Sequence, residues 1–184
     1  MPAPASVLRR ISDQLVAPRA SRGELLIVYT AAVAGSALAV VLAAGSGLAL
    51  PSLAVVAVVA FDLFGGSVAN ATAAAKRRFH GPGRGWRQHL GFVVAHVQPF
   101  VLALVVPGFG WATAAAIYGL VVAAALVVLA APPRLRQPVA FGTTTFALTT
   151  ALTGITVPAA LVWFAPVMLI KLLLGHLLPG ETGP

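Results

Sequence analysis

Cysteine is absent from the 184-residue chain, and charged residues are few. The lack of cysteine excludes disulfides and thiolate metal sites. Charged residues make up 9% of the chain and hydrophobic residues 59%, whereas soluble domains carry about one quarter charged residues. This composition excludes an ordinary soluble domain and indicates an integral membrane protein.

Acidic residues are the scarcer of the two charge types, with 4 Asp and Glu against 12 Lys and Arg and a net charge of +8. In a soluble protein this excess would suggest nucleic-acid binding. Here the basic residues flank apolar runs, where they orient the chain and attract anionic lipid. We therefore expect no nucleic-acid partner, and expect the lipid bilayer and anionic headgroups at the basic loops as partners.

Long apolar runs follow one another along most of the chain. Glycine, proline and basic residues separate them into six predicted spans, at 25–48, 51–75, 89–107, 111–131, 139–156 and 158–178. The sequence thus predicts an all-α, polytopic integral membrane bundle of about six transmembrane helices over 25–178. A basic segment, 1–24, precedes it as a short interfacial helix or a disordered tail, and a short tail, 179–184, follows it.

The basic residues predict the orientation of the chain. Eleven of the 12 would lie on one side of the membrane: Arg9, Arg10, Arg19, Arg22, Lys76, Arg77, Arg78, Arg84, Arg87, Arg134 and Arg136. The loops on the opposite side carry none. Because cytoplasmic loops are enriched in Lys and Arg, we expect both termini in the cytoplasm. The expected location is a membrane crossed several times, the plasma (inner) membrane if the chain is prokaryotic.

Small residues and prolines predict how the spans pack and bend. Small side chains repeat every four residues along the first span, at Ala31, Gly35, Ala39 and Ala43. Such a stripe allows close helix approach, either within the chain or between copies in a homo-oligomer. Pro99 and Pro166 each remove a helical hydrogen bond, so the third and sixth spans should bend.

A group of polar residues lies at membrane depth. Asp62 precedes Lys76 by about 21 Å of helix, close to the middle of the hydrocarbon core. Gly66 and Asn70 share its helix face. Other spans supply further polar residues toward the cytoplasmic side, namely His89, His96, Lys171 and His176. We predict that these form a polar cluster in an interior that opens to the cytoplasm and narrows to Asp62.

Two features beside this cluster have competing interpretations. Thr145, Thr149 and Thr153 share one face of the fifth span, where with Gly66 they could line a pathway or simply bond to their own helix carbonyls. His80, in a glycine-rich loop, is expected to be solvated.

The histidines form no HxxxH, HxxH or HExxH motif, so the compact ligand sets of membrane metalloenzymes are absent. A divalent metal or a haem would need ligands that converge from different spans. We therefore expect no metal site and no cofactor.

These observations support three hypotheses for function. The first is binding or translocation of a small polar solute, ion or proton through the polar cluster. The second is a membrane-embedded enzyme acting on a lipid-soluble substrate, with His89 or His96 as the acid-base group. The third is a noncatalytic membrane assembly subunit, in which Asp62 only holds helices together, either protonated or paired with Lys171.

Overall fold

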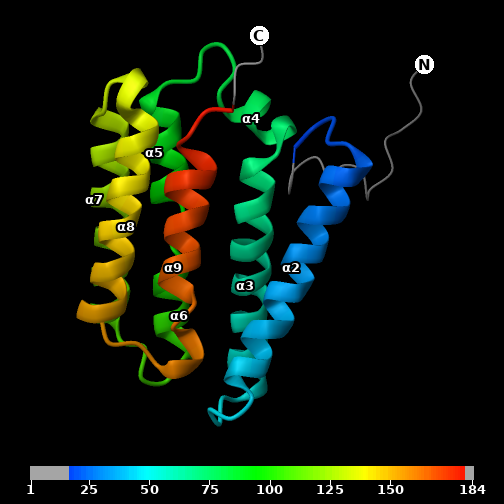
Figure 1. Ribbon diagram of the computed structural model, residues 1–184. Coiled ribbons are helices and arrows are strands. Elements are labelled where there is room, and N and C mark those ends of the chain that lie inside the picture. Colours follow the sequence, from blue (N-terminus) through cyan, green and yellow to red (C-terminus); the bar gives the residue numbers. More distant parts are fainter. Residues whose placement is uncertain (1–16, 181–184) are drawn as a thin grey trace.

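A computed structural model describes residues 17–180, and every regular element in this range is a helix (Figure 1). The short interfacial helix predicted within the segment 1–24 falls on residues 1–16, which lie outside the described residues. The long helices are α2 (Arg22–Ala43), α3 (Leu50–Ala71), α7 (Trp111–Ala130) and α8 (Arg136–Gly154). The shorter elements are α4 (Ala73–Phe79), α5 (Trp86–Val94), α6 (Gln98–Val105), η1 (Pro133–Leu135), η2 (Ala159–Leu161), α9 (Phe164–Leu169) and the π-helix η3 (Ile170–His176).

Five helical stretches are long and apolar enough to cross a membrane: Arg22–Ala43, Leu50–Ala71, Trp86–Val105, Trp111–Ala130 and Ala159–His176. This agrees with an all-α protein that crosses a membrane several times. The remaining long helix, α8, corresponds to the predicted span 139–156 and packs against α7. Its threonines make it less apolar than the other five.

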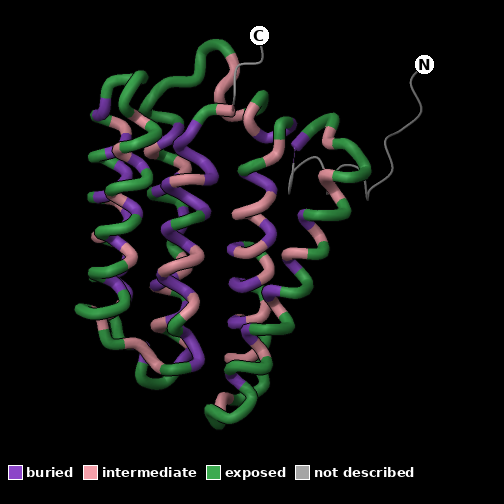
Figure 2. The backbone as a smooth tube through the Cα atoms, viewed as in Figure 1, coloured by how far each residue is buried: buried purple, intermediate pink, exposed green. Residues whose placement is uncertain are grey.

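The helices form a bundle with α2 at one edge and α7 and α8 at the other (Figure 1). The stretch Ala159–His176 lies between them and is the most enclosed, with 56% of its residues buried against 22–33% in the other four (Figure 2). The start of α2, helix α4, the start of α5 and the α7–α8 connection all lie at one end of the bundle. Because these segments carry the basic residues, we call it the basic end.

Three predicted spans are interrupted in the structure. The span 51–75 ends at Ala71, since Thr72 takes an extended conformation and its side chain accepts a hydrogen bond from the Ala75 amide, starting α4. The span 89–107 divides into α5 and α6 ahead of Pro99. The span 158–178 changes from 3-10 to α to π geometry around Pro166. Both prolines therefore change the helix more than the predicted bend, because each lacks an amide donor.

The small-residue stripe of the first span is used within the chain. Three of its four predicted members, Gly35, Ala39 and Ala43, are buried, whereas Ala31 is only half-buried and the neighbouring Ala32 is buried instead. Helix α2 packs mainly against α3. A Cβ atom on Gly35 would lie 2.2 Å from the Phe64 ring. The glycine is thus required for the close approach of these two helices.

We expect Gly35→Ala to lower the free energy of unfolding by about 1–3 kcal/mol, because the added methyl group overlaps Phe64. Gly119→Ala is the matched control, since its Cβ would meet nothing within 4 Å; it should be neutral or stabilising by up to about 1 kcal/mol. Thermal unfolding of the purified variants in detergent measures both. Equal stability of the two variants would contradict this packing.

Candidate functional site

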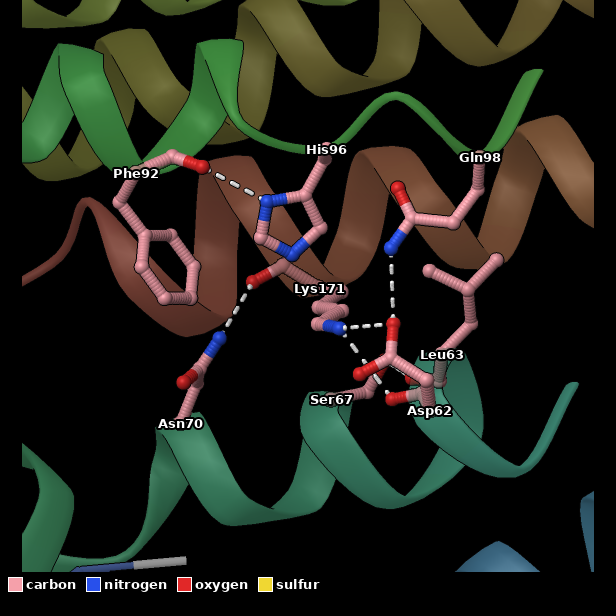
Figure 3. Close-up of polar contacts among 8 residues, drawn as sticks. All are labelled: Asp62, Leu63, Ser67, Asn70, Phe92, His96, Gln98 and Lys171. Carbon is pink, nitrogen blue, oxygen red and sulfur yellow. Dashed lines mark hydrogen bonds and ion pairs between the residues drawn. The ribbon is translucent and has the colours of Figure 1, made fainter. Parts of the chain in front are cut away.

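Asp62 and Lys171 form an ion pair between α3 and η3 (Figure 3). Lys171 Nζ lies 2.7 Å from Asp62 Oδ2 and also donates to the Asp62 carbonyl oxygen at 3.2 Å. The lysine side chain is 3% exposed, whereas the aspartate side chain is 49% exposed. The pair therefore joins a fully enclosed ammonium group to a carboxylate that reaches the surface of the bundle.

The lysine side chain extends away from the basic end to reach this carboxylate. Asn70 Nδ2 donates to the Lys171 carbonyl at 3.4 Å, whereas Nζ reaches Asp62, two helical turns earlier on α3. A Cβ on Gly66 would lie 2.5 Å from Lys171 Cε and 2.7 Å from Nζ. The glycine beside Asp62 thus provides the space that the ammonium group occupies.

The break between α5 and α6 brings a third group to the pair. Gln98 is the first residue of α6, and its Nε2 donates to Asp62 Oδ2 at 3.0 Å. The amino end of a helix carries partial positive charge, which favours a nearby carboxylate. Gln98 was not among the predicted site residues. The signal was present, because the residue stands immediately before a proline inside an apolar span.

The same break places His96 beside the pair. Its Nδ1 donates to the Phe92 carbonyl at 2.7 Å (Figure 3), so Nε2 of the neutral ring is left as a hydrogen-bond acceptor. His96, Asn70, Gln98 and the ion pair line a cavity of about 320 Å³. Gln98 Oε1 is buried and has no hydrogen-bond partner among the described residues. The cavity thus offers unused acceptors next to Asp62.

Lys171 is carried by a π-helix, Ile170–His176. Such wide turns are rare and often occur at functional sites. Gly175, in the same turn, allows close packing on α3, since a Cβ there would lie 3.2 Å from Asn70 Cβ.

Three histidines gather between this cavity and the basic end. His89 Nδ1 and His176 Nε2 lie 3.3 Å apart, and His80 Nε2 donates to the His176 carbonyl at 2.9 Å. Phe92 stacks on His176 at 3.8 Å and touches His96 at 4.7 Å, measured between ring centroids. The expectation that His80 is solvated is wrong, because this hydrogen bond and its stacking on His89 hold it half-buried.

The histidines do not form a metal centre as they stand. Among residues 17–180, no group of three or more His, Asp or Glu side chains is arranged to hold a metal ion.

Lys76 closes the site at the basic end. Its Nζ donates to the Gly175 carbonyl at 2.5 Å and also to the Leu178 carbonyl. Burial lowers the pKa of Lys76 to about 8. Burial also lowers the pKa of His80, and the positive charges of Lys76 and Arg136 lower it further.

The threonines of α8 lie apart from this cluster. Thr145, Thr149 and Thr153 are on the exposed face of the helix, and their hydroxyls donate to the Phe141, Thr145 and Thr149 carbonyls respectively. The threonines therefore bond to carbonyls of their own helix, which is the interpretation that competed with a pathway lining. In this structure only Gly66, of the four residues expected to line a pathway, adjoins the cluster.

No known protein family, curated protein or solved structure matches this chain.

We expect Asp62→Asn to destabilise the protein, because it leaves the enclosed Lys171 ammonium without a counter-charge. Breaking a fully buried ion pair costs about 3–5 kcal/mol, and the half exposure of Asp62 reduces our expectation to about 1–3 kcal/mol. The double variant Asp62→Asn/Lys171→Met should recover most of this loss. Unfolding of the two single variants and the double variant in detergent tests this coupling. A loss of stability in the double variant equal to the sum of the two single losses would refute it.

The Lys76 pKa predicts a pH dependence of stability. Between pH 8 and the ordinary lysine value of 10.5, the unfolded chain holds a proton that the folded chain has released, so stability should rise with pH. The melting temperature of the natural protein should therefore rise relative to that of Lys76→Met as the pH rises above 8. An unchanged difference between pH 7 and 10 would contradict the burial of the charged amine.

Proposed function

We propose that this chain is a six-span membrane protein with both termini in the cytoplasm, which binds and passes a proton or a small polar solute at the Asp62–Lys171 pair. The observation that carries the proposal is this ion pair in the middle of an apolar helix, with its carboxylate half exposed beside a polar cavity. The α8 helix supplies the sixth span, and the basic end faces the cytoplasm.

The position of Asp62 along α3 supports a site deep in the membrane. The residue comes 12 positions after Leu50 and nine before Ala71, so about 18 Å and 14 Å of helix separate it from the two ends. Placing an ionisable group at such a depth costs about 2.5–3.5 kcal/mol. A site that carries this cost is typical of proton and solute pathways.

The elements that carry the site also resemble a transport arrangement. Transporters commonly bind their substrates near the bilayer midplane, between discontinuous helices whose amino ends point at anionic groups. Here α6 begins beside the Asp62 carboxylate, and the opposing helix is widened by the π-turn at Lys171. A purely structural ion pair would need neither feature.

Access from the basic end would pass the histidines. The histidines in that direction are His96, His176, His89 and His80, which contact one another directly or through Phe92. Beyond Asp62, toward the opposite end, the core is filled by apolar side chains including Val59, Leu102 and Phe109. We infer that passage requires this apolar half to open while the cavity closes.

Flux measurements test the proposal. Protein reconstituted in liposomes with an internal pH-sensitive dye should dissipate an imposed pH gradient. Asp62→Asn should abolish this activity, because an amide side chain does not bind and release a proton as a carboxyl group does. Ser67→Ala is the matched control on the next turn of α3, since among the described residues its hydroxyl donates only to the Leu63 carbonyl, at 2.7 Å. Normal proton and solute flux in folded Asp62→Asn protein would refute a role for the pair in transport.

A membrane-embedded enzyme is the second candidate. A lateral cavity of about 210 Å³ between α2 and α3 is lined by Val28, Tyr29 and Phe61 and also reaches Asp62. Its apolar lining suits a lipid-soluble substrate. Turnover of such a substrate that is lost in His89→Gln or His96→Gln, without flux, would favour this alternative.

A further inference from the structure

A second polar cavity, of about 310 Å³, lies at the basic end and shares no residue with the Asp62 cavity. One wall is the start of α8 with the turn before it, Pro133–Pro138. The other wall is the chain that follows η3, at Leu178, Pro179 and Gly180. We call it the α8 cavity.

The walls of the α8 cavity are held in place by groups outside it. Lys76 donates to the Leu178 carbonyl, and a Cβ on Gly180 would lie 3.1 Å from Lys76 Cβ. On the other wall, Pro133 and Pro138 restrict the backbone on either side of the two arginines. The cavity is therefore preformed.

Among the described residues, the α8 cavity is lined by two cations and no anion. Arg134 is exposed and Arg136 is half-buried. Neither is in an ion pair, since the one ion pair within residues 17–180 is that of Asp62 and Lys171. The Arg136 Nε atom is buried and has no hydrogen-bond partner among the described residues. A buried guanidinium donor without an acceptor is costly unless a ligand supplies one.

The backbone contributes little to this site. The Arg136 amide already donates to the Pro133 carbonyl, and Pro138, the third residue of α8, has no amide hydrogen. The arginine side chains, and above all the unpartnered Arg136 donor, therefore point to an anionic ligand.

We propose that the α8 cavity binds a phosphate group. Arginine suits phosphate because its planar guanidinium can donate two parallel hydrogen bonds to two oxygens. Two sources supply this chemistry: the phosphodiester of an anionic lipid, whose headgroup lies at the level of the helix ends, and free phosphate in the adjoining aqueous phase.

The test uses the full chain purified in an uncharged detergent. Native mass spectrometry measures retention of phosphatidylglycerol and of phosphatidylcholine with the same acyl chains. The protein should retain phosphatidylglycerol preferentially, and Arg136→Gln should weaken this by about tenfold, as expected when one charge-assisted bidentate contact is lost. Arg87→Gln is the matched control, because it removes the same charge at the basic end from a residue that does not line the cavity.

Competition by inorganic phosphate distinguishes the two sources. Displacement of the lipid by millimolar phosphate, with a rise in melting temperature, indicates that free phosphate also enters the cavity. Retention of the lipid under those conditions assigns the site to a headgroup. Both results support the proposal.

Two results would overturn the proposal. One is equal weakening by Arg87→Gln, which would show only a diffuse attraction to basic residues. The other is no preference for phosphatidylglycerol together with no effect of phosphate. If Arg136→Gln lowers the melting temperature, Arg134→Gln replaces it, because that exposed side chain has no packing role.

Discussion

The site depends on the counter-charge that balances one buried lysine. The Lys171 side chain is almost fully enclosed, so its ammonium needs a counter-charge, and Asp62 supplies it. This requirement explains several neighbouring residues at once. Gly66 leaves room for the ammonium group, Asn70 bonds to the lysine backbone and Gln98 completes the bonding of the carboxylate. The glycine and the asparagine come from α3 and the glutamine from α6, so the ion pair connects α3, α6 and η3, which are otherwise apolar.

Breaks in helices position these polar groups. A continuous third span would hold His96 and Gln98 on a regular helical surface, whereas the turn before Pro99 directs both toward α3. The π-turn does the same for Lys171. Interrupted backbone at membrane depth is tolerated where it lines a cavity or is covered by protein. The polar cavity and the broken helices are therefore parts of one arrangement.

The two ends of the bundle differ in chemistry. The basic end holds Lys76, the described arginines and the α8 cavity, and the Asp62 cavity lies deeper in the bundle, while the opposite half of the core is apolar. The proposed phosphate site and the proposed transport site occupy separate cavities. Lys76 links the two regions, because it donates to Gly175 of η3, the helix that carries Lys171, and to Leu178 in the wall of the α8 cavity.

The sequence by itself determined the all-helical class with several apolar helices of membrane-spanning length, and it placed Asp62 near the middle of one of them, because apolar length and helical rise are local properties. It also suggested a role for Gly66 beside the aspartate. Only the tertiary structure decided that Lys171 reaches Asp62, that Gln98 belongs to the site, that His80 is half-buried and that the α8 threonines face outward. The reason is that these features depend on the rotation of each helix and on where a proline breaks it, and neither is fixed by spacing along one apolar span.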